Sequence, residues 1–271
     1  MKKYLWILAA AFLLQACSKD EEEGPYVPWR PGDDKEETID LDKATKVMIL
    51  TEQAKNRIVM IDQPTGKVAW EWTAADSGLS AAEQAWFDLP DEAKPVYNRT
   101  CVLVTASGGG VALIRIADKK AMFYAKPGGN PHSAEVLPDG NVVVASSTGN
   151  LLSVYVYNGA DSYVSRPAFT MPVHSAHNVV WDRKRGCLWT ATGAQLLKLA
   201  YNGKRTAPEL TQVRSYDMAA GNTDAHDLAP VCGEDAMYVS TNQHVYKFDC
   251  AAEKFCLLYT SDAADDLIGV D

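Results

Sequence analysis

The sequence predicts an all-β fold, a β-propeller of four-stranded antiparallel blades with about five units present and the C-terminal part cut short. Two observations carry this prediction. Short runs of β-branched and aromatic residues, bounded by Gly, Asn, Asp or Pro, follow one another along the chain, and no long stretch has helical periodicity. These runs also repeat in groups of about 45 residues, a period typical of propeller blades.

The repeat is defined by the residue expected to open the first strand of each unit. These residues are Phe87, His132, His177 and His226, at intervals of 45, 45 and 49 residues (132 − 87, 177 − 132 and 226 − 177). A second column of small or hydroxyl residues ends the second strand, in "VTASGG", "VASSTGN", "TATGAQ" and "VSTNQH". The same column in "ILTEQAKN" predicts a further unit that begins near Glu37, which makes five.

The strands expected within residues 37–255 follow these columns. In chain order they are residues 46–50, 57–62, 68–72, 100–106, 110–116, 121–125, 141–146, 151–157, 187–192, 195–201, 236–241 and 244–249, and the one short helix is expected within 80–88. Radial packing of such sheets buries their faces and leaves only short outer edges. A β-sandwich is the alternative; it explains the strands but not the regular repeat.

One turn carries a family resemblance. "DQPTGKVAWEW", residues 62–72, resembles the repeat of quinoprotein-type propellers, in which Thr-Gly-Lys forms a hairpin turn and the Trp docks one blade on the next. The chain as a whole resembles a group of WD-like propeller lipoproteins of Gram-negative gut-type bacteria that carry a domain of unknown function. This resemblance implies architecture and location, but no reaction.

The N-terminus predicts export and lipid anchoring. Residues 1–17 read as a signal peptide, with two lysines before an apolar run that is too short to span a bilayer. The run ends in "LQAC", which resembles a lipobox and implies lipidation of Cys17, hence a membrane anchor. Residues 18–36 are expected to be an acidic, disordered tether. Their "SKDEEE" resembles an acidic export signal, which favours outer-membrane, cell-surface exposure over a spacer facing the periplasm.

The C-terminus changes character abruptly at Cys256. "CLLYTSDAADDLIGVD", residues 256–271, resembles the translated read-through of a sequencing adapter. We therefore expect the natural chain to continue beyond Phe255 in other residues. We also expect the propeller of residues 37–255 to be incomplete, and the last sixteen residues to carry no structure or function.

Charge and cysteine content exclude several classes of protein. A net charge of −9 argues against nucleic acid as a partner. There is no Walker A loop, G-x-G-x-x-G, H-E-x-x-H or G-x-S-x-G motif, and no C-x-x-C spacing for zinc. Export permits disulfides. Cys232 and Cys250 flank the same strand pair in the last unit and form a candidate disulfide.

The repeated histidines form the candidate site. His132, His177 and His226 should open the inner strands of three consecutive blades and point toward a shared axis at the channel mouth. Imidazoles that converge in this way suit a ligand or a divalent metal, with Asp227 as a neighbouring carboxylate. The alternative is a scaffold hydrogen bond repeated once per blade, as in WD-type propellers. Phe87 in the second unit shows that the fold does not require histidine there.

Three functions follow as hypotheses. The first is a binding protein that takes a glycan or glycopeptide at His132, His177, His226 and Asp227; Trp181 and Trp189 are the aromatic rings suited to stack on sugar. The second is a metal-dependent lyase or hydrolase of acidic polysaccharide, because pectin-degrading propeller lyases are similar in the placement of a histidine-held metal. The third is a non-catalytic scaffold for an outer-membrane protein. Binding is favoured over catalysis, and no catalytic residue is assigned.

Overall fold

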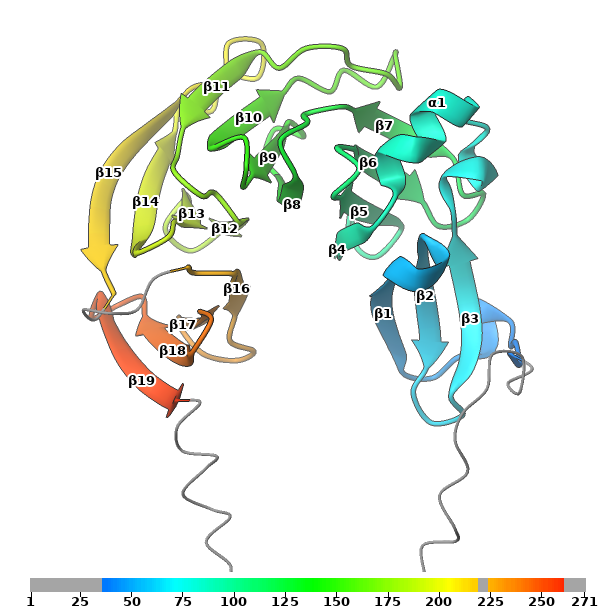
Figure 1. Ribbon diagram of the computed structural model, residues 1–271, viewed down its shortest axis with the longest axis horizontal. Coiled ribbons are helices and arrows are strands. Elements are labelled where there is room, and N and C mark those ends of the chain that lie inside the picture. The colour runs from blue at the N-terminus through cyan, green and yellow to red at the C-terminus, as the bar shows by residue number, and fades with distance from the viewer. Residues whose placement is uncertain (1–35, 219–223, 261–271) are drawn as a thin grey trace, which may run out of the picture. The chain divides into compact units, whose positions relative to one another are not determined.

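The computed structural model describes residues 36–218 and 224–260. The chain divides into two units, Met1–Glu37 and Thr38–Asp271, and every helix and strand described lies in the second. In that unit five antiparallel sheets follow one another in chain order (Figure 1). The predicted all-β propeller is therefore confirmed.

The blades are numbered here by their sheets. Blade 1 holds β1 (Val47–Glu52), β2 (Arg57–Asp62) and β3 (Lys67–Trp72). Blade 2 holds β4 (Pro90–Val96), β5 (Cys101–Ala106), β6 (Val111–Arg115) and β7 (Ala121–Ala125). Blade 3 holds β8 (Pro131–Val136), β9 (Val142–Ser146), β10 (Leu151–Tyr155) and β11 (Phe169–Pro172). Blade 4 holds β12 (Asn178–Asp182), β13 (Cys187–Ala191), β14 (Gln195–Tyr201) and β15 (Leu210–Asp217). Blade 5 holds β16 (Asp227–Pro230), β17 (Ala236–Ser240), β18 (His244–Asp249) and β19 (Lys254–Thr260).

Short helices precede β1, separate β1 from β2, and form the connection from blade 1 to blade 2. The 3-10 helices are η1 (Leu41–Lys43), η2 (Gln53–Lys55), η3 (Ala74–Ser77) and η4 (Ala85–Phe87), and the α-helix is α1 (Ala81–Gln84). A capping box starts α1, because the Glu83 amide donates to the Ser80 hydroxyl (3.4 Å) and the Glu83 carboxylate accepts from the Ser80 amide (2.9 Å). The short helix predicted within residues 80–88 is confirmed.

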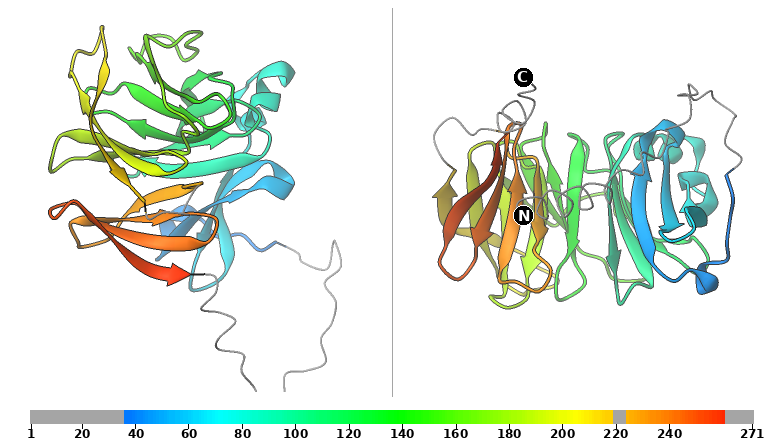
Figure 2. Two further views of the ribbon diagram at one scale, coloured as in Figure 1. Left: turned by 60° about the vertical axis from the view of Figure 1, so that its left-hand side comes forward. Right: turned by 90° about the horizontal axis from the view of Figure 1, so that it is seen from below.

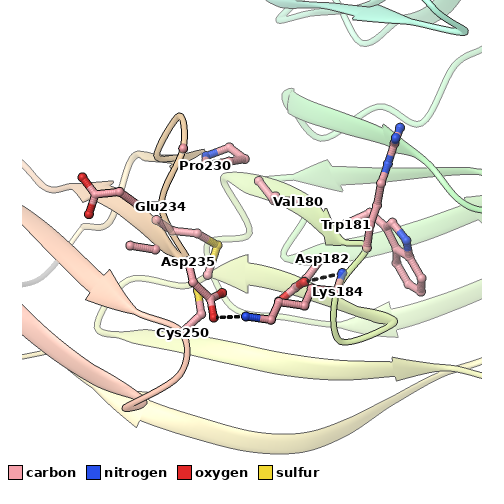
Figure 3. Close-up of a pocket in the computed structure, with 12 residues that line it drawn as sticks. Val180, Trp181, Asp182, Lys184, Pro230, Glu234, Asp235 and Cys250 are labelled. Carbon is pink, nitrogen blue, oxygen red and sulfur yellow. Dashed lines mark hydrogen bonds and ion pairs between the residues drawn. The ribbon is translucent and has the colours of Figure 1, made fainter.

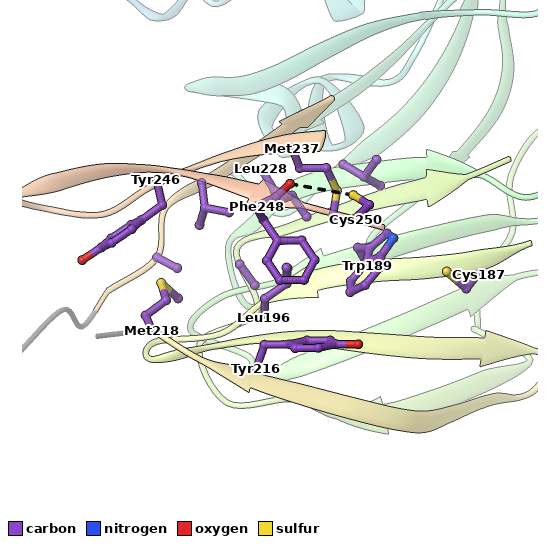
Figure 4. Close-up of a cluster of buried hydrophobic side chains, with 14 residues drawn as sticks. Cys187, Trp189, Leu196, Tyr216, Met218, Leu228, Met237, Tyr246, Phe248 and Cys250 are labelled. Carbon is purple, nitrogen blue, oxygen red and sulfur yellow. Dashed lines mark hydrogen bonds between the residues drawn. The ribbon is translucent and has the colours of Figure 1, made fainter. Parts of the chain in front are cut away.

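The hydrophobic core lies between neighbouring blades rather than within one sheet. Between blades 4 and 5, the fully buried Trp189 packs edge-on against Phe248, with ring centroids 5.4 Å apart, and lies 5.8 Å from Tyr216 (Figure 4). Between blades 2 and 3, Phe123 meets Tyr155 at 6.0 Å. Viewed from below, the strands of all the sheets run between the same two faces of the unit (Figure 2). Each blade is thus stabilised mainly by its neighbours.

The end of the propeller corrects one prediction. β19 runs to Thr260 and pairs with β18, with Leu257 opposite Tyr246 and Cys256 opposite Lys247. The expectation that nothing after Phe255 is structured is therefore wrong for residues 256–260. The outer edge of β18 offers unpaired backbone groups that an extended segment directly after the hairpin satisfies. Residues 261–271, Cys17 and the signal and tether up to residue 35 lie outside the described residues.

The candidate disulfide is also wrong. Cys232 lies in the exposed turn between β16 and β17, and Cys250 is buried beside the carbonyl of Phe248, so both thiols are free. Burial raises the pKa of Cys250 to about 11, and does the same for Cys187. The spacing of the two cysteines in the sequence indicates that both lie beside one strand pair. It does not indicate whether their thiols can meet.

These environments predict thiol reactivity. In native protein at pH 8, iodoacetamide should modify the exposed Cys232 and Cys256 within minutes and leave the buried Cys101, Cys187 and Cys250 unmodified until the protein is denatured. Peptide mass spectrometry of native and denatured samples measures this. Recovery of a Cys232–Cys250 linked peptide from non-reduced protein would contradict the structure.

Candidate functional site

The starts of the inner strands bring the predicted histidines together. His132 lies within β8, and His177 and His226 directly precede β12 and β16. The rings of His132 and His177 are 5.0 Å apart between centroids, and those of His177 and His226 are 4.8 Å apart. Residues separated by 45 and 49 positions (177 − 132 and 226 − 177) are therefore in direct ring contact, as the repeat predicts.

The same position in blade 2 belongs to Asp91, not to Phe87. Both β4 and β8 carry a bulge after their first proline, so that Asp91 and His132 are each the extra residue. The Asp91 carboxylate lies 3.7 Å from Nδ1 of His132. Phe87 is instead buried in η4, where it packs edge-on against Trp72 at 5.5 Å. The predicted register of the second unit is thus wrong by four residues.

Asp91, His132, His177 and His226 therefore form one row, called here the axial row. The row is only partly accessible: the side chain of His132 is 29% exposed and that of Asp91 10%. Burial lowers the pKa of both His132 and His177, and the neighbouring imidazoles lower them further. Burial raises the pKa of Asp91, although the Ser107 hydroxyl donates to its carboxylate at 2.9 Å.

A local hydrogen bond fixes the tautomer of His177. The Ser175 carbonyl only accepts, so Nδ1 of His177, 2.9 Å away, carries the proton and its Nε2 is an acceptor. Nε2 of His132 lies 2.9 Å from the Asn130 amide nitrogen, and Nδ1 of His132 lies 3.7 Å from the Asp91 carboxylate. Both nitrogens of His132 therefore face partners within the protein, and Nε2 of His177 is an acceptor that these bonds leave for a ligand.

A second polar layer lies further along the inner strands and is centred on Lys94. Its ammonium donates to Ser133 Oγ (3.1 Å), the Ala134 carbonyl (3.0 Å) and the Val179 carbonyl (2.8 Å), and lies 3.1 Å from Glu92 and 3.8 Å from Glu135. Burial raises the pKa of both glutamates, against the lowering effect of the Lys94 charge. This layer joins the inner strands of blades 2, 3 and 4 directly beneath the axial row.

The other predicted site residues lie apart from the row or have a structural role. Asp227 follows His226 and is exposed, and its carboxylate accepts from the Leu228 amide at 2.8 Å. Trp181 lies near the far end of β12 and packs edge-on against Tyr201 at 6.3 Å. Trp189 is fully buried, so its suggested role in stacking on sugar is wrong.

Trp181 belongs instead to a pocket of about 420 Å³ at the opposite ends of β12 and β16 from the histidines (Figure 3). Asp182 and Asp235 line this pocket, and both carboxylates pair with Arg185, at 2.9 Å and 2.7 Å. The guanidinium lowers the pKa of both carboxyls. All groups of this network are paired, so it reads as a connection between blades 4 and 5.

The described residues hold neither a metal-binding cluster nor a membrane-spanning helix. Within residues 36–218 and 224–260, no group of three or more His, Cys, Asp or Glu side chains could hold a metal ion. The divalent metal therefore stays a prediction from the sequence and has no part in the function proposed below. Over the same described ranges, no helix is long and apolar enough to cross a membrane.

The protein is a β-propeller, because its antiparallel sheets follow one another and pack side by side. Its candidate site is the axial row at the start of the inner strands. The chain belongs to a family described as a "Family of unknown function (DUF6528)", which matches residues 1–261. No curated protein matches the sequence.

Several solved structures share the fold. Hydrazine synthase of Kuenenia stuttgartiensis is 15% identical with a TM-score of 0.52, over 82% of this chain and 64% of its own. BamB from Moraxella catarrhalis is 11% identical (TM-score 0.51, 81% and 62%), and virginiamycin B lyase from Staphylococcus aureus is 10% identical (TM-score 0.54, 78% and 66%). The chain thus spans about two thirds of the length of these structures, and the likeness concerns the fold alone.

Proposed function

We propose that this protein is a lipid-anchored propeller of the outer membrane, exposed at the cell surface, that binds a glycan or glycopeptide at the axial row. Acyl chains on Cys17 hold the protein to the membrane, and residues 18–36 act as the tether. The sequence supports this placement through the lipobox-like "LQAC" and the acidic run after it.

The observation that carries the binding proposal is the chemistry of the axial row. His132 and His177 are half-buried imidazoles whose lowered pKa values make them neutral at pH 7, and Nε2 of His177 is left as an acceptor. A sugar hydroxyl group can donate to this nitrogen and accept from a neighbouring donor. The Asp91 carboxylate adds an acceptor at one end.

A binding assay with oligosaccharides tests the proposal. We expect a hit in a panel of neutral and acidic surface glycans, and we expect His177→Ala to weaken that hit at least about tenfold, roughly 1.4 kcal/mol, in isothermal titration calorimetry. His174→Ala is the matched control, because His174 is an exposed histidine of the same connection. Equal affinities of the His177→Ala and His174→Ala proteins, or no hit at all, would contradict the proposal.

The same titration has a pH signature. At a pH below their lowered pKa values, His132 and His177 become protonated, lose their acceptors and repel one another. Because burial lowers the pKa values of His132 and His177 from the ordinary value of 6.5, affinity should be unchanged from pH 8 to pH 6.5 and decline only at lower pH. A ligand bound by charge attraction to imidazolium groups would show the opposite trend.

A further inference from the structure

Three aromatic side chains lie together beside β7, the outermost strand of blade 2. The rings of Trp86 and Tyr124 are 6.3 Å apart between centroids, and the ring of Tyr163 lies 5.9 Å from the first and 5.2 Å from the second. Tyr163 is 43% exposed, and neither Trp86 nor Tyr124 is buried. These three rings, called here the rim cluster, therefore form an aromatic surface that solvent reaches.

Tyr163 is brought to the rim cluster from blade 3. It lies in residues 156–168, between β10 and β11, the longest of the described connections that lead into the outermost strand of a blade (Figure 1). This connection runs along the edge of β7, where the Tyr124 amide donates to the Ser162 carbonyl (2.7 Å) and the Val164 amide donates to the Tyr124 carbonyl (3.0 Å). Long connections without secondary structure of their own are usually functional. Here the extra length adds one ring to the cluster.

The rim cluster keeps polar groups for a ligand. The Tyr124 hydroxyl donates to the Glu83 carboxylate at 2.8 Å and is satisfied. The Trp86 indole N–H and the Tyr163 hydroxyl make no hydrogen bond to any described residue. The Lys126 ammonium lies 5.2 Å from the centroid of the Trp86 ring and makes no ion pair within residues 36–218 and 224–260. Donors that the described residues leave unused thus stand beside the exposed rings.

Backbone loops connect the rim cluster to the axial row. The loops after β5, β7 and β9, residues 107–110, 126–130 and 147–150, form a ledge in which each loop bonds to the one before. A Cβ atom at Gly129 would lie 2.6 Å from Cα of Gly149, so only glycine allows these loops to approach so closely. The amide nitrogen of Asn130, at the inner end of the ledge, lies 2.9 Å from Nε2 of His132. The bonds along the ledge are Gly110 N–H to the Trp86 carbonyl, Gly128 N–H to the Gly109 carbonyl and Gly149 N–H to the Gly129 carbonyl.

Strand order sets the distance that a ligand would have to span. Asp91 lies at the start of β4, and Tyr124 lies near the end of β7, three strands further out at the same end of the sheet. The register pairs Pro90 with Ala106, Thr105 with Val111, and Val111 with Ala125. Neighbouring strands are about 4.8 Å apart, which makes the span across the sheet roughly 14 Å. A single pyranose ring is shorter than this, so a ligand that contacts both places is an oligosaccharide.

We propose that the rim cluster is a second sugar subsite, and that the ligand is an oligosaccharide that runs from the axial row along the ledge to these rings. This inference rests on the proposed binding of a glycan at the axial row. The apolar face of one sugar packs on the ring of Tyr163 or Trp86, while the oxygens at its edge accept from Lys126 and the indole N–H. The subsite therefore adds affinity only for chains long enough to reach it.

Calorimetric titration with sugar chains of increasing length tests the subsite. The probes are the neutral and acidic members of the glycan panel, cello-oligosaccharides and oligogalacturonates among them, each from the monosaccharide to the tetrasaccharide. Tyr163→Ala should weaken tetrasaccharide binding about tenfold and leave monosaccharide binding within about twofold of the parent. Tyr163→Phe keeps the ring and should bind the tetrasaccharide as the parent does. Tyr238→Ala, at an exposed ring of blade 5, is the matched control and should change neither affinity.

A second variant keeps the test decisive if Tyr163→Ala fails to fold. Lys126→Met changes an exposed side chain and should weaken tetrasaccharide binding at least about threefold. Parent-like tetrasaccharide binding by both variants would overturn the subsite and leave the axial-row site in place. So would equal losses for every chain length in Tyr163→Ala, because the ring would then act through the fold. Failure of every member of the panel to bind the parent protein would contradict both proposals.

Discussion

Replacing Lys94 by methionine should lower the free energy of unfolding by about 3 kcal/mol, because removal of one partner from a largely buried charge network leaves the other charges uncompensated. Glu92 and Glu135 would each lose the Lys94 charge, and three acceptor oxygens would lose their donor. Denaturant unfolding of both proteins at pH 8 measures the loss. Lys120→Met, at an exposed lysine, is the matched control and should change stability by less than about 0.5 kcal/mol.

The free energy of unfolding lost in Lys94→Met should be larger at high pH than at low pH. Burial already raises the pKa of Glu92 and Glu135, and removal of the Lys94 charge raises both further. A folded-state pKa above the unfolded value means that the folded protein binds more protons in that window, so stability falls as pH rises through it. The deficit of Lys94→Met should therefore be smaller at pH 5 than at pH 8. An electrostatic role for Lys94 would be contradicted if the stability deficit of Lys94→Met did not change with pH. It would also be contradicted if adding Glu92→Gln to Lys94→Met did not reduce that deficit.

Trp189→Ala should be more damaging still, with a loss in the free energy of unfolding of about 4 kcal/mol, typical of a large buried aromatic residue. The indole is fully buried between blades 4 and 5, contacts Phe248 and Tyr216, and donates to the Asp182 carboxylate at 3.2 Å. Thermal and denaturant unfolding measure the effect. Tyr238→Ala, at a 42% exposed aromatic residue of the adjoining blade, should stay within about 0.5 kcal/mol of the parent. Similar losses in the two variants would contradict the packing described here.

The fold was predictable because a propeller repeats its own signals. The column of small and hydroxyl residues at the end of each second strand identifies β1, β5, β9, β13 and β17 correctly, and the three histidines fall where the repeat places them. The meeting of their rings follows from radial geometry, since equivalent positions of neighbouring blades converge toward the axis.

The repeat in the sequence did not identify Asp91, the fourth member of the axial row, because the start of β4 is locally irregular. A bulge shifts the start of β4, and the interval from Asp91 to His132 is 41 residues (132 − 91) rather than 45. The signal that could have found Asp91 is the shared proline, since "LPDEA" and "NPHSA" align on Pro90 and Pro131. The spacing of residues in the sequence does not specify which face of a strand meets the next blade. For this reason it did not predict that Trp189 is buried or that Cys232 and Cys250 are separate.

The axial row also constrains when the site can exist during synthesis. Its members come from four blades and span 135 residues (226 − 91), whereas each blade is built mainly from hairpins between adjacent strands. Sheets with such local contacts can form one after another as the chain leaves the ribosome. The row acquires its last ring only when blade 5 docks on blade 4. A ligand of the row would therefore bind late intermediates but not early ones, and would report on assembly of the whole array.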